Sequence, residues 1–263
     1  MLPRDRRTPD GHDPKFRRSV VNESSSWRVY IRRHITKSGE ATITGQGHDD
    51  AAITVLGAIT VRRHGRATLV ASHPQRSILL ALAAQVGRGV PRDDLVDCVW
   101  GPDAPPTGPN MIYRHIGGLR RLLEPGLPKH SEGRRIIRAG DGYRLMATPD
   151  TLDLMRFRDG VARARVLEAG HDDRAALDTF AAMLAMRTGP MRYGPGPAPV
   201  TAVRREYLAV FRDAVDLALR IERPGDLVHL VRHYAADLMA DADLATRIEA
   251  LRTACLARPV RVR

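Results

Sequence analysis

The chain of 263 residues has few cysteines, few lysines and few aromatic residues. Its two cysteines, Cys98 and Cys255, are too few for a disulfide framework or a cysteine-based zinc site, and they fit a reducing cytosol. The longest uncharged apolar stretch, Ile78–Val86, is far shorter than the roughly 20 residues that a membrane span needs. The charged N-terminus also has no apolar segment typical of a secretory signal. These absences predict a soluble, cytoplasmic protein.

Positive charge is abundant and comes almost entirely from arginine. Only three of the 42 basic residues are lysine, and 30 acidic residues leave a net charge of +12. Residues 51–150 carry the largest share, an excess of six positive charges. An arginine-rich composition is expected of a GC-rich genome, but arginine is also well suited to contact phosphates and base edges. The charge therefore predicts an anionic partner, nucleic acid or membrane surface, without choosing between them.

The hydrophobic pattern divides the chain into three parts. Residues 1–51 are polar and irregular and are predicted to form a disordered basic arm, in which a hairpin between 27–32 and 41–44 would be marginal. Residues 52–148 combine β-branched stretches with helical periodicity. The predicted elements are strands at 53–57, 59–62 and 67–70, helices beginning after Ser72, after Pro91 and at Pro109, and a hairpin of 134–138 with 143–146.

Residues 149–263 are predicted to be helical throughout. Their amphipathic segments span 152–169, 173–187, 201–222, 226–240 and 243–257. Helices of this length joined by short turns predict stacked, TPR-like helical hairpins. The fold class expected for the whole chain is therefore an α+β domain followed by an all-α domain.

Three strands, three helices and a terminal hairpin within about 100 basic residues predict a winged helix-turn-helix. The third helix has an apolar stripe on one face and is thin enough to enter a major groove of about 12 Å. Its opposite face and the hairpin carry the candidate DNA contacts. These residues are Thr107, Asn110, Tyr113, Arg114, Arg120, Arg121, Arg138 and Arg144. The alternative is that the arginines only form a solvated face of an amphipathic helix.

The hairpin has a glycine-rich tip that suits a wing. Gly140 and Gly142 flank Asp141, and glycine there would allow a positive φ and a close approach to the DNA backbone. Arg138 and Arg144 lie on the two flanking strands, so that at least one of them is expected to reach phosphates.

Several motifs follow one another in the order found in the Streptomyces antibiotic regulatory proteins, which the chain resembles. They are Val55–Gly57, Pro74–Ala81, Asp94–Gly101, Ile116–Leu123 and Gly142–Leu145, followed by Leu152–Phe157, Ala169–Ala176 and Leu184–Pro190. The resemblance implies an OmpR/PhoB-like DNA-binding domain at 52–148 and a shortened bacterial transcriptional activator domain at 149–263. Members usually carry a basic residue where this chain has Gly118, which implies that a groove contact is missing here.

The resemblance also implies partners and a function. Such proteins activate secondary-metabolite genes, binding direct repeats of double-stranded DNA as homodimers or in tandem and contacting RNA polymerase holoenzyme. For this chain we therefore expect a cytoplasmic, nucleoid-associated activator of antibiotic biosynthesis genes with no membrane partner. The alternative is a protein-interaction module whose winged helix has lost sequence-specific DNA binding.

An enzymatic function has little support in the sequence. No P-loop or complete GxGxxG motif is present, so no nucleotide cofactor is expected. Gly-His-Asp occurs at 11–13, 47–49 and 170–172, but an aspartate at a helix start more often caps free N–H groups than binds a metal. We therefore predict a non-enzyme without catalytic residues, cofactor or metal.

Overall fold

The computed structural model describes residues 51–128, 131–191 and 198–257. All of these residues belong to one compact unit. The predictions for residues 1–50, which include the disordered arm, the hairpin and two Gly-His-Asp copies, lie outside the described residues. Below, residues 51–148 are called the winged-helix segment and residues 149–257 the helical segment.

The winged-helix segment begins with an antiparallel sheet in the order β1-β2-β3. Its strands are β1 (Ala52–Thr54), β2 (Thr60–Arg63) and β3 (Arg66–Leu69). Val61 of β2 lies opposite Ile53 of β1 and Thr68 of β3. The turn before β3 uses His64 and Gly65, both with positive φ. Thr151 covers the outer edge of β1, because the Ile53 N–H donates to the Thr151 carbonyl at 2.8 Å.

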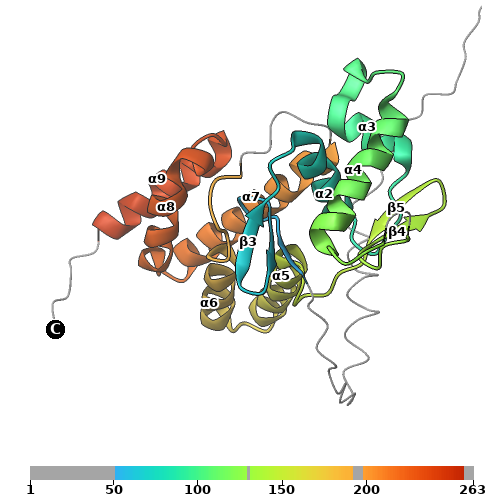
Figure 1. Cartoon of the computed structure of the whole chain (residues 1–263). Helices are drawn as coiled ribbons and strands as arrows, with labels where there is room; N and C mark the ends of the chain where they lie inside the picture. The colour runs from blue at the N-terminus through green and yellow to red at the C-terminus, as the bar shows by residue number, and fades with distance from the viewer. Residues whose placement is uncertain (1–50, 129–130, 192–197, 258–263) are drawn as a thin grey trace, which may run out of the picture. The chain divides into compact units, whose positions relative to one another are not determined.

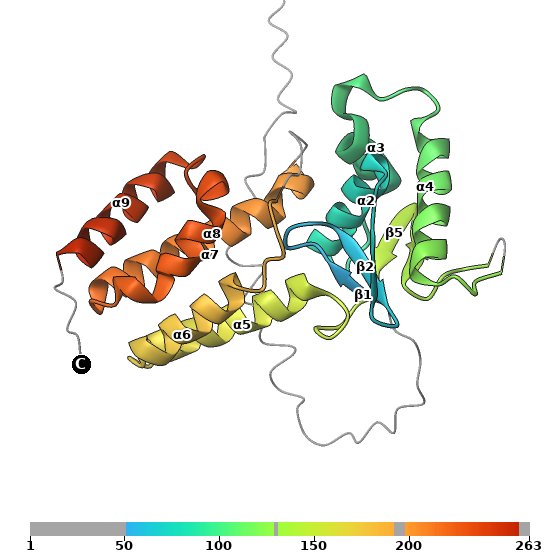
Figure 2. The same cartoon turned by 60° about the vertical axis from the view of Figure 1, so that its left-hand side comes forward.

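Three helices and a hairpin complete this segment, as the periodicity predicts. They are α2 (His73–Ala84), α3 (Arg92–Trp100), the 3-10 turn η2 (Gly101–Asp103), α4 (Gly108–Leu123), β4 (Ile136–Ala139) and β5 (Gly142–Leu145). Ser72 occupies the predicted N-cap position of α2, but its side chain makes no capping hydrogen bond. Figure 1 shows β4 and β5 side by side, and Figure 2 shows β5 beside α4, the positions that a wing and a recognition helix take in a winged helix.

In the helical segment, successive helices run in opposite directions and pack into one bundle (Figures 1 and 2). Its elements are α5 (Asp153–Ala169), α6 (Asp173–Leu184), α7 (Ala198–Arg220), η3 (Pro224–Leu227), α8 (Val228–Leu238) and α9 (Ala242–Leu256). Asp172 and Asp241 cap α6 and α9, since their side chains accept the N–H groups of Ala175 and Leu244.

Helix α6 ends three residues earlier than predicted. Arg187 is buried between the rings of Tyr207 and Tyr234, with its guanidinium carbon 5.4 and 4.3 Å from the two centroids. It also pairs with Asp237, and the Tyr234 hydroxyl donates to its carbonyl at 2.6 Å. The helix therefore ends in a turn at Ala185 and Met186, and the contacts of Arg187 draw its side chain inward.

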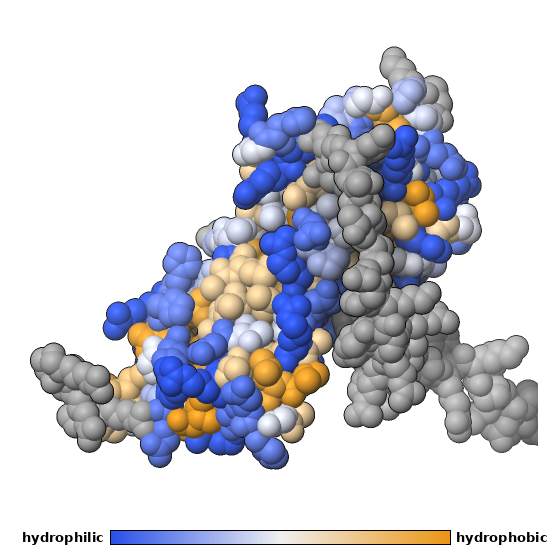
Figure 3. Space-filling model, turned by 90° about the horizontal axis from the view of Figure 1, so that it is seen from below, coloured by the Kyte–Doolittle hydropathy of each residue, from blue (hydrophilic) through white to orange (hydrophobic). Residues whose placement is uncertain are grey.

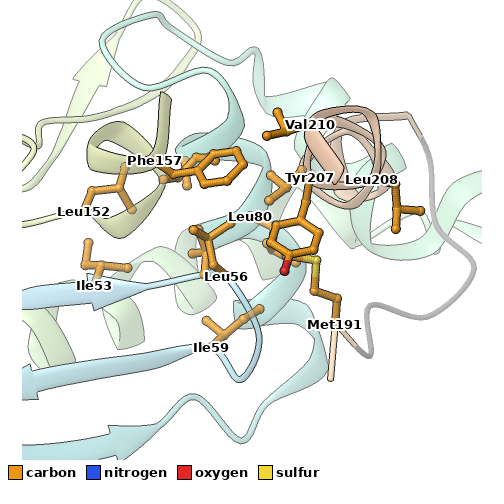
Figure 4. Close-up of a cluster of buried hydrophobic side chains, with 14 of the residues drawn as sticks. Ile53, Leu56, Ile59, Leu80, Leu152, Phe157, Met191, Tyr207, Leu208 and Val210 are labelled. Carbon is orange, nitrogen blue, oxygen red and sulfur yellow. The ribbon is translucent and has the colours of Figure 1, made fainter. Parts of the chain in front are cut away.

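The two segments share one hydrophobic core. Figure 4 shows Leu56 and Leu80 of the winged-helix segment beside Phe157 and Tyr207 of the helical segment. Phe157 and Tyr207 stack with centroids 5.8 Å apart, and all four side chains are buried. The core continues across residue 148, where the sequence predicts a domain boundary. That boundary stays a prediction.

Buried polar contacts join the segments at the turn after β1. The Asp153 carboxylate accepts the Val55 N–H at 2.9 Å and the Leu56 N–H at 2.9 Å. The Thr188 N–H donates to the Leu56 carbonyl at 2.9 Å. A Cβ at Gly57 would lie 2.8 Å from the backbone nitrogen of Gly189, so this approach requires glycine. The helical segment therefore holds both hydrogen-bonding edges of Leu56.

The surface carries mixed side chains. On the face in Figure 3, apolar residues form small separate patches among hydrophilic ones. Within the described part of the chain, no helix is both long enough and apolar enough to span a bilayer.

Candidate DNA-binding surface

Helix α4 has one buried and one exposed face. Ile112, Ile116, Leu119 and Leu123 are buried, as their spacing predicts. On the opposite side, the exposed predicted contacts are Thr107, Asn110, Tyr113, Arg114 and Arg121. Asn110 and Arg114 are four residues apart, so they lie on neighbouring turns of one face. Their amide and guanidinium groups can form the paired hydrogen bonds by which base edges are recognised.

Arg120 differs from these residues because it faces the hairpin. It is half-buried, its Nε donates to the Ile136 carbonyl at 2.9 Å, and its guanidinium carbon lies 5.8 Å from the Tyr143 ring centroid. The Glu124 carboxylate adds a second connection by accepting the Arg134 N–H at 3.0 Å. Arg120 of α4 and Glu124, its C-cap residue, thus attach the hairpin to the helix, and this positioning role for Arg120 was not foreseen from sequence.

The hairpin turns through Gly140 and Asp141. Gly140 has the predicted positive φ, 61°, and a Cβ there would meet open space. Gly142 is buried instead, and a Cβ on it would lie 1.9 Å from the Val90 carbonyl oxygen. The expectation of a positive φ at Gly142 is wrong, and glycine is needed there because β5 approaches Val90 closely.

The contact between β5 and Val90 brings the start of α3 to the wing. Val90 and Tyr143 exchange two backbone hydrogen bonds, of 2.7 and 3.0 Å. Arg92, two residues after Val90, points its Nη1 at the Tyr113 hydroxyl, 3.5 Å away. The rings of Tyr113 and Tyr143 meet edge to face at 6.3 Å. Elements α3, α4 and β5 thereby converge on one aromatic pair.

Three arginines surround this pair. Burial, and after it the neighbouring Tyr113, raises the pKa of Tyr143. The positive charges of Arg120, Arg138 and Arg92 lower it by less, so the net shift is upward. Tyr143 therefore stays protonated at neutral pH. We call the group of Arg92, Tyr113, Arg120, Arg138 and Tyr143 the Tyr143 junction.

The two predicted wing arginines have different surroundings. Arg138 is exposed and lies opposite Tyr143 in the β4-β5 register. Arg144 is half-buried opposite Ile137, and its Nε is buried without a hydrogen-bond partner in the described residues. Arg138 is thus the wing arginine that adjoins the exposed face of α4.

The paired glycines of α4 have separate surroundings. A Cβ at Gly118 would lie 2.2 Å from the Gln75 side-chain nitrogen of α2, whereas a Cβ at Gly117 would meet only Arg121 at 3.8 Å. Gly118 therefore faces the neighbouring helix, and Gly117 faces the open side. The residue that the resemblance marks as a missing groove contact lies where α2 and α4 approach each other.

Arg92 was missed by the sequence reasoning, although a signal for it exists. A cation in the first turn of a helix is unfavourable beside the positive end of the helix dipole, where acidic residues are preferred. Arg92 occupies that turn of α3 together with Asp93 and Asp94. A residue that breaks a local rule in this way is a candidate for a functional role.

No other chemistry competes with this surface among the described residues. The third Gly-His-Asp copy provides the α6 cap Asp172, and the part of the chain that is described holds no cluster of potential metal ligands. Cys98 is buried, and burial followed by the charges of Asp94 and Asp97 raises the pKa of its thiol to about 11. The thiol is therefore protonated and unreactive at neutral pH.

The sheet, the three helices and the hairpin of residues 51–148 have the arrangement of a winged helix. Residues 66–145 match the family described as transcriptional regulatory protein, C terminal, and form a domain of that kind. The predicted resemblance to the Streptomyces antibiotic regulatory proteins is confirmed, because the chain is similar to regulatory proteins of that group.

The similarity covers part of each relative. Regulatory protein AfsR of Streptomyces coelicolor is 28% identical over 60% of this chain, which spans 15% of AfsR. AfsR of Streptomyces griseus is 27% identical over 65% of this chain and 16% of its own length. Transcriptional regulator RedD of Streptomyces coelicolor is 28% identical over 57% of this chain and 41% of its own length. This chain therefore spans less than half of each of these relatives.

A solved structure supports the fold class across both segments. Mycobacterium tuberculosis EmbR, in complex with a low affinity phosphopeptide, matches 79% of this chain and 56% of its own chain. The TM-score is 0.60 and the sequence identity is 19%. The predicted α+β winged helix followed by an all-α segment is thus confirmed.

Proposed function

We propose that this protein is a DNA-binding transcriptional regulator that activates antibiotic or other secondary-metabolite biosynthesis genes. The exposed α4 face carries the proposal, because it offers Asn110 and Arg114 to base edges and Arg121 to phosphate on a rigid helix. The matched family and the regulatory relatives support the same function. A cytoplasmic, nucleoid-associated location follows from this role.

We further propose that two copies bind direct repeats. A single recognition helix reads only a few base pairs, so a second copy is needed for a specific site. If the copies face the same way, the repeats are about one helical turn, ~10.5 bp, apart. The exposed surfaces of the helical segment are then available to contact the second copy and RNA polymerase holoenzyme.

The test begins by selecting duplexes from a random library with the full chain. Arg121→Ala should weaken binding to all duplexes and reduce the slope of log K against log salt by about 0.9. Asn110→Ala and Arg114→Ala should instead reduce discrimination between selected and unrelated duplexes by about 1–3 kcal/mol. A salt dependence that is flat for the unmodified protein contradicts the proposal.

The spacing of the selected repeats tests the tandem arrangement separately. Inserting about five base pairs moves the second site to the opposite face of the duplex and should abolish cooperative binding, and inserting a full turn should restore part of it. If the half-turn insertion is harmless, the protein does not bind as two adjacent copies.

The alternative, an interaction module without specific DNA binding, is favoured by the adjacent glycines Gly117 and Gly118 and by the shortened helical domain that the resemblance implies. The argument from the glycines is weaker because Gly118 faces Gln75 of α2. The same selection distinguishes the two, since a module that lacks specificity enriches no sequence.

A further inference from the structure

Arg92 lies at the Tyr143 junction, outside the residues predicted to contact DNA. Its Nη1 approaches the Tyr113 hydroxyl at 3.5 Å, and its Nε and Nη2 each lie 3.4 Å from Asp93 Oδ1. The Arg92 side chain is 34% exposed and that of Asp93 is 77% exposed. These long, solvent-accessible contacts hold the guanidinium beside the exposed face of α4 without burying it.

Arg92 is a stable cation on a positively charged part of the surface, since the hydrogen bond with Tyr113, and after it Asp93, raise the pKa of its guanidinium against the opposing effect of burial. It stands in the first turn of α3, near the positive end of the helix dipole. Together with Arg120 and Arg138 it affects Tyr143, so three guanidinium groups lie around one ring. Asp93 forms an ion pair with Arg92. The positive charges of these guanidinium groups would attract a phosphate, whereas a neutral partner would gain nothing from them.

We propose that Arg92 is an additional contact to a DNA phosphate and that Asp93 competes with the phosphate for it. In the free protein the Asp93 carboxylate accepts hydrogen bonds from the Arg92 guanidinium, as a phosphate oxygen would on DNA. On DNA, the shorter and better aligned bonds between arginine and phosphate replace these 3.4 Å contacts. Asp93 thus moderates affinity for DNA of any sequence. This inference rests on the proposed DNA-binding function.

The experiment measures binding of the full-length variants by fluorescence anisotropy, to a selected duplex and to an unrelated duplex, over a series of salt concentrations. Arg92→Ala should weaken binding to both duplexes about tenfold, the loss of one charge-assisted contact, and lower the salt slope by about 0.9. Asp93→Asn should strengthen binding to both about two- to threefold, because exposed ion pairs are weak competitors.

A double-mutant cycle separates competition from general repulsion. If Asp93 acts through Arg92, Asp93→Asn has no effect in a chain that already carries Arg92→Ala. The matched control is Asp94→Asn, an exposed neighbour that removes the same charge, which should change affinity equally in both backgrounds. Thermal midpoints verify folding, and Arg92→Gln replaces Arg92→Ala if the shorter side chain destabilises the chain.

Two results overturn the inference alone. They are an equal gain from Asp93→Asn with and without Arg92, and an Arg92→Ala variant that binds the unrelated duplex as tightly and with the same salt slope as the unmodified protein. A wild-type chain that binds neither duplex overturns the proposed function as well, so the two failures are distinguishable.

Discussion

Asp153 is the side chain whose replacement best tests whether the winged-helix and helical segments unfold together. It is 9% exposed and accepts two backbone N–H groups, from Val55 and Leu56, across the boundary between the segments. Asp153→Ala leaves both donors buried without an acceptor. Each unsatisfied group costs about 1–3 kcal/mol, so the free energy of unfolding should fall by about 2–6 kcal/mol.

Asp153→Asn should cost less than Asp153→Ala. Burial raises the pKa of the Asp153 carboxyl, against the opposing effect of the Leu56 and Val55 N–H groups, so the carboxylate bears a desolvation cost that an amide lacks. Asparagine retains one acceptor oxygen and loses the charge. We expect about half the loss seen with alanine, within the range for a single buried donor.

The assay is urea unfolding followed by circular dichroism at 222 nm, together with hydrogen exchange of peptides from α4 and α5. Coupled segments should show one transition, shifted to lower urea, with faster exchange in both helices. Asp150→Ala is the control, because Asp150 is exposed and its replacement changes the charge equally. If the free energies of unfolding of Asp153→Ala and Asp150→Ala differ by less than about 0.5 kcal/mol, the ordinary range for surface changes, the prediction is refuted.

Three further expectations follow from local geometry. Gly142→Ala should destabilise the protein by about 1–3 kcal/mol and weaken DNA binding, because its Cβ would lie 1.9 Å from the Val90 carbonyl oxygen. Gly140→Ala should lower the free energy of unfolding by about 1–2 kcal/mol, because alanine disfavours the left-handed φ although its Cβ would meet open space. Gly117→Ala should raise the free energy of unfolding by up to about 1 kcal/mol and so raise the thermal midpoint. An unchanged midpoint would show that a side chain on the open face of α4 is restricted. The folded-state pKa of the Cys98 thiol is raised from 9.0 to about 11, so the protonated thiol contributes its full stability below pH 9 and loses it as pH rises toward 11. Cys98→Ala should therefore flatten the fall in the free energy of unfolding across that range, and an unchanged slope would contradict this.

The periodicity of the sequence was sufficient to predict the elements and the two faces of α4. Ile112, Ile116, Leu119 and Leu123 recur at helical spacing, and that spacing follows from local backbone geometry. The hairpin tip at Gly140 and the caps Asp172 and Asp241 depend equally on neighbours within a few residues. Such features are determined locally, so the sequence alone indicates them.

The order of the motifs in the chain was likewise sufficient to indicate the family and the fold class. It did not indicate which side chains on α4 face solvent and which face the wing. Arg120 and Arg121 are adjacent and chemically identical, yet Arg120 binds the Ile136 carbonyl and Arg121 is exposed. The difference depends on where the hairpin packs, which no local pattern encodes.

Only the tertiary structure decided the roles of the residues that join distant parts of the chain. Gly142 is required by Val90, Arg92 is brought to Tyr113, and Asp153 holds Val55 and Leu56 across nearly 100 positions. Each of these contacts forms because the shared core closes the chain upon itself and brings together backbone and side-chain groups that are far apart in sequence. Their chemistry is visible in the residue types, but their partners are set by packing.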